Sequence, residues 1–377
     1  MNSRSTASLI AAILVAGFTM TAIGATPGVR AVTVAEGVAM GWAVAFLPGG
    51  DLLVTERAGT MRRISAGGVL GKPIKGVPAV VFRGQGGLLD LVLDSRFEAN
   101  RTLYFCYSAG SNAGSANSTA LASAKLSADG ARLDSVRVIF QQSPMVDSRA
   151  HFGCRIVEAP DGNLFLTLGD RFSRMQDAQT LDNHHGKIVR ITKEGAAPSD
   201  NPFVGKAGAR PEIWSLGHRN LQGAALDAES RLWTTEHGAQ GGDELNRPQA
   251  GLNYGWPVIT HGVNYGGGKI GEGINKKAGL EQPVHQWTPS IAPSGLAVLT
   301  SDRYGPTWKN SLFAGSLKFN YVARLTIENS KVASIEPIID LGQRVRDVRQ
   351  GPDGFLYVLT EAPKGRIVRL EPIGRGG

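Results

Sequence analysis

A histidine and an aspartate stand at the two ends of one predicted β-hairpin. His151 lies in HFGCR and Asp170 in LTLGDR, and two apolar runs joined by an Asp-Gly turn separate them. A hairpin returns to its starting edge, so both side chains should reach the same rim of the fold. An imidazole held by a carboxylate is the usual form of a general base. On its own, however, such a pair is more often a structural hydrogen bond.

Polar and cationic side chains follow apolar strands in three further segments. Arg219 and Asn220 lie in SLGHRNLQG, Lys318 lies in SLKFN, and Arg344 and Arg346 lie in QRVRDV. Because Arg344 and Arg346 are two residues apart on a strand, they point to the same face. Considered alone, each of these cationic side chains is predicted to be an exposed surface charge. Gathered on one face, the cations would bind a polyanionic ligand.

The segment TTEHGAQGGDELNRPQAGLNYGW is rich in glycine and carries the acids Glu236, Asp243 and Glu244. Calcium binds carboxylate and backbone oxygens, so this loop is a candidate calcium site. It lacks the spacing of an EF-hand, and a solvated loop is the alternative.

Several other chemistries lack their motifs. The sequence contains no G-x-x-x-x-G-K-[ST] loop, no G-x-G-x-x-G between a strand and a helix, and no G-x-S-x-G elbow. The pair His184 and His185 is not part of an H-E-x-x-H motif and is not accompanied by a C-x-x-C motif. These observations argue against nucleotide binding, serine hydrolysis and a zinc site.

A recurring unit positions the polar side chains. It is clearest as GGDLLVTERAGTMRRI near Gly50, DGNLFLTLGDR from Asp161 and DGFLYVLTEAPKGRIVRL from Asp353, with three weaker copies from Asn100, Glu229 and Asn310. Each unit reads turn, strand, turn, strand. Six copies give roughly 50 to 55 residues per unit, which is near the size of a four-stranded propeller blade. The sequence therefore predicts an all-β protein, a six-bladed β-propeller of four-stranded antiparallel blades.

Composition agrees with this class. Of 377 residues, 42% are hydrophobic, 19% are charged and 49 are glycine, which indicates a large core and many turns. The net charge of +8 suits an anionic ligand. Basic residues are scattered among acids, so we expect no nucleic-acid partner.

The N-terminus reads as an export signal. A basic residue, Arg4, precedes an apolar stretch over residues 7–23, followed by small residues at 24 and 25. We predict a secretory signal peptide over residues 1–25, a single propeller domain over residues 26–377, and a periplasmic or secreted protein. An uncleaved membrane anchor is the alternative. In an oxidising compartment Cys106 and Cys154 could pair or remain two buried thiols.

The ordered set of segments resembles the soluble pyrroloquinoline quinone (PQQ)-dependent sugar dehydrogenases, the aldose and glucose dehydrogenase family. The matching segments are RGQGGLLDLVLDSRF, HFGCRIVEAPDGNLFLTLGDR, IWSLGHRNLQG, TTEHGAQGGDELNRPQAGLNYGWP, LFAGSLKFN and RVRDVRQGPDGFLYVLTE. They span nearly all of the chain after the signal. The family fold is a six-bladed propeller, as the repeats predict.

The resemblance implies roles for individual residues. His151 would remove the proton of the sugar's anomeric hydroxyl while hydride passes to C5 of the quinone, and Asp170 would orient the imidazole. Donors to the quinone oxygens would be Arg219, Asn220 and Gln85. The carboxylates of PQQ would face Lys318, Arg344 and Arg346. The reaction so implied is oxidation of an aldose to a lactone.

The resemblance also implies two calcium sites. One ion would be held by the cofactor and by backbone oxygens of Gly238 and Ala239, and a second, structural ion by Glu244 and Tyr254. Glucose-specific members carry proline at the position of Ala239 and an acid at the position of Ala150. This chain is therefore more similar to the broad-specificity aldose branch.

The expected partners are an aldose and an external electron acceptor, a quinone or a cytochrome, with a monomer favoured over a homodimer. Two other classes compete with the dehydrogenase: a calcium-dependent, lactonase-type propeller hydrolase and a non-catalytic exported binding propeller. The hydrolase would need acidic side chains converging on an ion in the central channel, where this sequence places cations.

Overall fold

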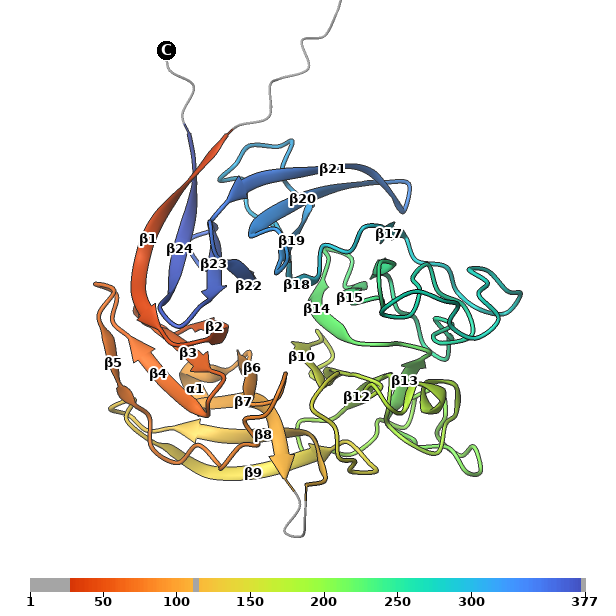
Figure 1. Cartoon of the computed structure of the whole chain (residues 1–377). Helices are drawn as coiled ribbons and strands as arrows, with labels where there is room; N and C mark the ends of the chain where they lie inside the picture. The colour runs from red at the N-terminus through yellow and green to blue at the C-terminus, as the bar shows by residue number, and fades with distance from the viewer. Residues whose placement is uncertain (1–27, 111–114, 374–377) are drawn as a thin grey trace, which may run out of the picture.

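The computed structural model describes residues 28–110 and 115–373, which form six four-stranded antiparallel sheets around a central axis (Figure 1). This arrangement confirms the predicted all-β, six-bladed propeller. The signal peptide predicted for residues 1–25 lies outside the described residues. No helix in the described ranges is both long enough and apolar enough to cross a bilayer.

Five blades take four consecutive strands each, ordered from the axis outward (Figure 1). Blade 1 contains β2 (Gly41–Phe46), β3 (Leu52–Glu56), β4 (Thr60–Ile64) and β5 (Leu70–Pro73). Blade 2 contains β6 (Leu88–Leu93), β7 (Thr102–Gly110), β8 (Asn117–Leu126) and β9 (Leu133–Gln141). Blade 3 contains β10 (Gly153–Glu158), β11 (Leu164–Leu168), β12 (Lys187–Ile191) and β13 (Ile213–Leu216). Blade 4 contains β14 (Leu221–Leu226), β15 (Leu232–Glu236), β16 (Asp243–Asn246) and β17 (His285–Trp287). Blade 5 contains β18 (Pro293–Val298), β19 (Leu312–Ser316), β20 (Tyr321–Glu328) and β21 (Lys331–Asp340). Two short helices, α1 (Phe97–Asn100) and the 3-10 helix η1 (Met175–Gln179), lie in loops.

Blade 6 closes the ring with strands from both ends of the chain. It contains β22 (Arg344–Gln350), β23 (Leu356–Glu361) and β24 (Gly365–Pro372), and its outermost strand is β1 (Val29–Val38). β1 pairs with β24 in antiparallel register from one end to the other.

The six sequence repeats mark the second strand of each blade, and most continue into the third. The Asp-Gly turns that precede these strands have the backbone expected of them: Gly162 has φ +83° and Gly354 has φ +82°. Only glycine adopts this region without a steric penalty, so the turn residues fix where each strand begins.

Buried charges join the blades near the axis. Arg155 on β10 lies 3.1 Å from Asp90 on β6 and 2.9 Å from Asp347 on β22, measured from Nη1 to a carboxylate oxygen. Arg349 on β22 binds the same two carboxylates. Arg155, Asp90 and Asp347 are almost inaccessible to solvent. This network, which the sequence analysis did not anticipate, ties blades 2, 3 and 6 together.

A disulfide between Cys106 and Cys154 joins β7 of blade 2 to β10 of blade 3. It decides the question that the sequence left open, in favour of a bridge over two buried thiols.

Candidate active site

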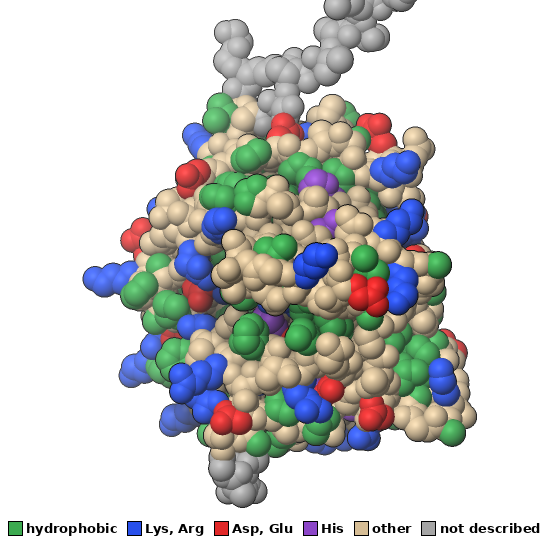
Figure 2. Space-filling view, turned by 45° about the vertical axis from the view of Figure 1, so that its right-hand side comes forward, with side chains coloured by type: hydrophobic (Ala, Val, Ile, Leu, Met, Phe, Trp, Pro, Cys, Tyr) green, Lys and Arg blue, Asp and Glu red, His purple; other side chains and the backbone are tan. Residues whose placement is uncertain are grey.

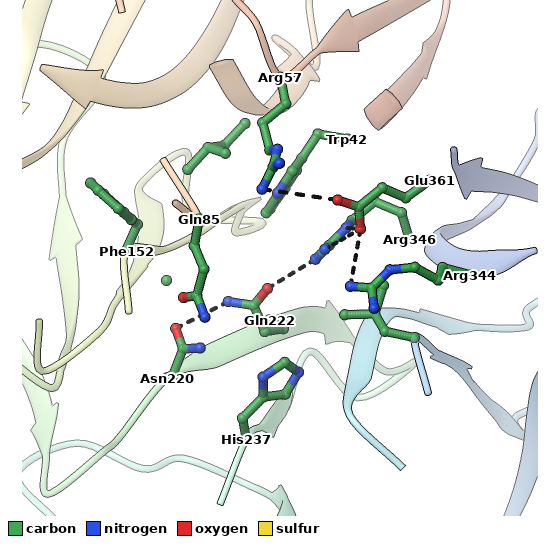
Figure 3. A pocket seen from close by; sticks show the side chains of 13 residues that line it. Trp42, Arg57, Gln85, Phe152, Asn220, Gln222, His237, Arg344, Arg346 and Glu361 are labelled. Atoms are coloured by element: carbon green, nitrogen blue, oxygen red, sulfur yellow. Dashed lines mark hydrogen bonds and ion pairs between the residues drawn. The ribbon is translucent and has the colours of Figure 1, made fainter. Parts of the chain in front are cut away.

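A cavity of about 100 Å³ opens on the axis of the propeller (Figure 3). Its polar lining comes from the beginnings of the innermost strands, the ends of the second strands and the loops beside them. In antiparallel blades these positions lie at the same end, so the side chains converge on one face. The residues that line the cavity include Trp42, Arg57, Gln85, Phe152, Asn220, Gln222, His237, Arg344, Arg346 and Glu361.

His151 and Asp170 are in contact beside this cavity. His151 Nδ1 lies 2.6 Å from Asp170 Oδ1, and both side chains are buried. The same carboxylate accepts hydrogen bonds from the Phe172 backbone N–H at 2.7 Å and from the Trp256 indole N–H at 2.7 Å. With three donors the carboxylate is fixed, and it holds the hydrogen on Nδ1 so that Nε2 carries the free lone pair.

The electrostatics of the pair favour a neutral imidazole and an ionised carboxylate. Burial lowers the pKa of His151, and the charge of Asp170 only partly offsets this effect. Burial alone would raise the pKa of Asp170, but His151 and Arg219 outweigh it and hold that pKa below its ordinary value. The imidazole is therefore an available base at neutral pH.

Three arginines surround one carboxylate on the side of the cavity away from Phe152 (Figure 3). Glu361 is ion-paired with Arg346 and lies 3.5 Å from Arg344 and 4.0 Å from Arg57. Burial would raise the pKa of Glu361, but the arginines lower it, so Glu361 is ionised. Three positive charges against one negative charge leave this side of the cavity cationic.

An amide chain connects the arginines to the loop before β14. Arg346 donates to Gln222 Oε1 at 3.1 Å, and Gln222 Nε2 donates to Asn220 Oδ1 at 3.1 Å (Figure 3). Glu236 accepts the backbone N–H of Arg219 at 2.6 Å. These contacts fix the positions of Asn220 and Arg219 before any ligand binds.

A second cavity of about 520 Å³ meets the first at His237. Gly238, Ala239 and Lys318 line it, and Lys318 is exposed. The carbonyls of His237 and Gly238 both accept hydrogen bonds from the guanidinium of Arg219. Together the two cavities have the size of ordinary small-molecule pockets, about 300 to 1,000 Å³.

Glu244 and Tyr254 lie apart from both cavities, on β16 and in the loop between β16 and β17. Asn246 Nδ2 bridges the carboxylates of Glu244 and Glu236, at 2.9 Å from each. Burial and the charge of Glu236 raise the pKa of Glu244 to about 8. Within residues 28–110 and 115–373, no three His, Cys, Asp or Glu side chains are grouped so that they could hold a metal ion.

Four aromatic side chains are exposed in the described part of the chain, and all four touch or adjoin residues of this region. Phe82 lies under Arg57, Phe172 lies edge-on to His151, Tyr265 lies under Arg219, and Phe319 lies under Lys318. The other charged side chains are spread over the surface: Figure 2 shows Lys and Arg scattered over the visible face, with Asp and Glu among them.

Comparison with known proteins assigns this arrangement to a family. The sequence model described as glucose/sorbosone dehydrogenase matches residues 38–369. The chain belongs to this family. Membership confirms the resemblance found in the sequence and the class of enzyme predicted from it, a sugar dehydrogenase.

Individual members of the family are similar over almost the whole chain. Aldose sugar dehydrogenase YliI of Escherichia coli is 46% identical over 335 residues, which cover 88% of this chain and 90% of that protein. The apo-form crystal structure of the soluble E. coli aldose sugar dehydrogenase matches with a TM-score of 0.87 and 42% identity, over 92% of this chain and 100% of that one. The PQQ-bound aldose sugar dehydrogenase of Streptomyces coelicolor matches with a TM-score of 0.76 and 28% identity, over 92% and 99%.

The structure brings together most of the residues singled out from the sequence of this family member. The cavities and their rim hold His151, Asp170, Gln85, Arg219, Asn220, Gly238, Ala239, Lys318, Arg344 and Arg346. Arg344 and Arg346 share a face, as their spacing predicts, but only Arg346 is buried. Glu244 and Tyr254 line neither cavity.

Sequence reasoning missed Arg57, Gln222, His237 and Glu361. A signal for some of them was present, since the second strand of three repeats ends in Thr-Glu: LLVTE, LWTTE and LYVLTE. The acid or the residue after it lines the cavity in each of these repeats, as Arg57, His237 and Glu361. Aligning the repeats on this ending would have identified all three.

Proposed function

We propose that the protein is a PQQ-dependent dehydrogenase that oxidises aldose sugars at the anomeric carbon to lactones and passes the electrons to an external acceptor. The observation that carries the proposal is the buried His151–Asp170 pair beside a cavity with a cationic wall. Neither feature alone would distinguish this reaction from a structural role. Together they offer a base for the sugar and a binding surface for a polyanionic oxidant.

The residues present fit PQQ, which carries three carboxylates. Arg57, Arg344 and Arg346 form the cationic wall, and Lys318 adds a charge from the second cavity. The Nε–H groups of Arg57 and Arg219 are buried and have no hydrogen-bond partner among the described residues. Buried donors without partners are costly unless a ligand satisfies them. Bound PQQ would supply an electrophilic carbon, C5, that takes the hydride from the sugar.

The chain's own residues then supply the rest. His151 Nε2 accepts the proton of the anomeric hydroxyl, and Asp170 stabilises the imidazolium so formed. Arg219, Asn220 and Gln85 donate hydrogen bonds where negative charge grows on the oxidant. Gln85 also accepts the backbone N–H of His151 at 2.8 Å, so the base and this donor are held together.

We also propose the two calcium sites. At the first, the backbone carbonyls of Gly238 and Ala239 would hold the ion, and the carbonyl of Gly238 also accepts a hydrogen bond from Arg219. At the second, the half-buried Glu244 and the buried Glu236 form a carboxyl pair that a cation near Tyr254 would stabilise. Calcium would act as a Lewis acid at the first site.

The exposed aromatic side chains of the region support a sugar as substrate. Pyranose rings present C–H faces that pack against aromatic rings, and exposed apolar groups around a cavity mark ligand sites. Phe172, which lies beside the base, is the one placed to contact the sugar that reacts.

The direct test combines purified protein with PQQ and Ca²⁺, then glucose or another aldose, and an artificial dye as electron acceptor. We expect dye reduction that requires both PQQ and the sugar. Sugar-independent binding of PQQ without turnover of any aldose would favour the binding propeller. Lactone hydrolysis without PQQ would favour the hydrolase.

The acid limb of the kcat/KM profile should lie below pH 6.5. His151 must be neutral to act, its folded pKa is lowered from an ordinary value of about 6.5, and activity is lost only as the pH falls through that lowered value. A pH series with a pH-insensitive dye measures the limb. Asp170→Asn removes a charge that raises this pKa, so its limb should move to lower pH still. A wild-type limb at or above pH 7 would contradict the assignment of the base.

Lys318→Ala should weaken PQQ binding about tenfold, the usual size of one hydrogen bond to a charged group. Titration of the quenching of protein fluorescence by PQQ measures it. Lys309→Ala is the matched control, because Lys309 is an exposed lysine paired with Asp302 outside both cavities. An unchanged titration for Lys318→Ala would refute its carboxylate role.

Three further proposals concern the oligomeric state, the cellular compartment and the electron acceptor. The first is that the protein acts as a monomer. The disulfide supports an oxidising compartment, the periplasm or the exterior, as the site of action. The open mouth of the second cavity supports transfer to an external acceptor such as a quinone or a cytochrome.

A further inference from the structure

His151, the proposed catalytic base, lies where blade 2 meets blade 3. His151 precedes β10, the first strand of blade 3, yet blade 2 and the loop that leads into it hold its segment. Gln85 accepts the N–H of His151 at 2.8 Å, and the Thr119 hydroxyl donates to the carbonyl of Phe152 at 2.7 Å. The third link is covalent, the disulfide from Cys106 to Cys154.

The backbone of this segment is in an unfavourable conformation. His151 has φ +54°, Gly153 has φ +66° and Cys154 has φ +85°. Positive φ is disfavoured for residues with a Cβ and persists only where surrounding contacts impose it. Cys154 lies in a β-bulge, where the pairing of β10 with β11 shifts register between Gly153 and Ile156.

The other end of the disulfide is a rigid anchor. Cys106 lies in the middle of β7, the second strand of blade 2, opposite Leu121 of β8. Both cysteines are fully buried in the largest apolar cluster. The bond therefore connects the fixed interior of blade 2 to a residue three positions from the base.

We propose that the Cys106–Cys154 disulfide is a positioning device for His151, which holds the left-handed His151–Cys154 segment so that the imidazole stays seated against Asp170. The role in turnover rests on the proposed function, whereas the seating of the imidazole does not. Charged groups facing the ring are Asp170, Arg219 and Arg171. None of these charged groups belongs to blade 2, to which the disulfide connects the His151 segment. The disulfide therefore affects the imidazole by holding the backbone and not by bringing a charge near the ring.

The test compares two variants that lack the bond. Cys106→Ala/Cys154→Ala removes the bond and keeps a Cβ at the strained position. Cys106→Ala/Cys154→Gly removes the bond and tolerates positive φ without cost. We expect kcat of the alanine variant to fall about 10- to 100-fold, the scale of a misplaced catalytic group, with KM and PQQ affinity within about twofold. The glycine variant should retain more of the turnover.

A second measurement does not need the reaction. NMR titration of labelled histidine in the protein without PQQ reports the His151 imidazole, assigned with His151→Ala. In the alanine variant the titration midpoint should rise toward about 6.5, because a loosened ring is less buried. The midpoint should stay low in the wild type and return toward the wild-type value in the glycine variant.

The outcomes separate two failures. If both variants lose only thermal stability, and kcat and the His151 titration match the wild type below the melting temperature, the positioning role is wrong. If no variant, wild type included, oxidises a sugar but the His151 midpoint moves as described, the proposed function is wrong and the positioning role stands.

Discussion

Replacing His151 with alanine should lower kcat about 10²- to 10⁴-fold, the usual contribution of a positioned general base. The imidazole acts in the chemical step, so the affinity for PQQ should change little. The cavity's cationic wall, which carries the cofactor in our proposal, consists of arginines that pair with Glu361 and not with His151. Dye reduction at saturating sugar measures kcat, and fluorescence titration measures the affinity.

His285→Ala is the matched control for this variant. His285 lies on β17, the outermost strand of blade 4, where its ring contacts Trp287. We expect its turnover to equal that of the wild type. Turnover of His151→Ala within about threefold of the wild type, far less than a base contributes, would remove His151 from the mechanism.

Replacing Arg155 with methionine should destabilise the fold by about 3 to 5 kcal/mol. The change keeps most of the side-chain volume but leaves the carboxylates of Asp90 and Asp347 buried, with Arg349 as the remaining cation of the network. An unpaired buried charge costs more than the ion pair contributed. Urea denaturation followed by fluorescence measures the loss.

Arg132→Met tests whether burial is the cause. Arg132 forms a closer pair with Asp134, at 2.6 Å, but its side chain is 60% exposed. Exposed pairs contribute about 0 to 1 kcal/mol, so this variant should unfold near the wild-type midpoint. Equal losses for the two variants would show that the position near the axis has no special importance.

The fold was predictable because the repeat and its turns are local signals. Asp-Gly turns, short apolar runs and their spacing lie within a few dozen residues of each other, and each repeat marked a strand of a different blade. The closure of the ring was not predictable in the same way. β1 carries no turn signature that identifies β24 as its partner, since that pairing depends on the whole ring.

In the candidate site, too, contacts between residues close in sequence could be predicted and contacts between distant blades could not. His151 and Asp170 could be paired from sequence because one hairpin connects them. Glu361 and Arg57 belong to different blades, and nothing near either residue indicates that their side chains lie 4.0 Å apart. Arg155, Asp90 and Asp347 look like ordinary strand charges for the same reason. The roles of these residues in binding and turnover stay predictions until the variants are measured.

The pairing of β1 with β24 constrains how the protein can be made. Arg30 and Glu371, which form an ion pair across this seam, are 341 positions apart. A nascent chain emerging from its N-terminus therefore exposes β1 for nearly the whole of synthesis before its partner exists. During that interval β1 is an unpaired strand that other chains could capture. The yield of correctly assembled protein should therefore depend on how well β1 is kept from other chains until β24 is available.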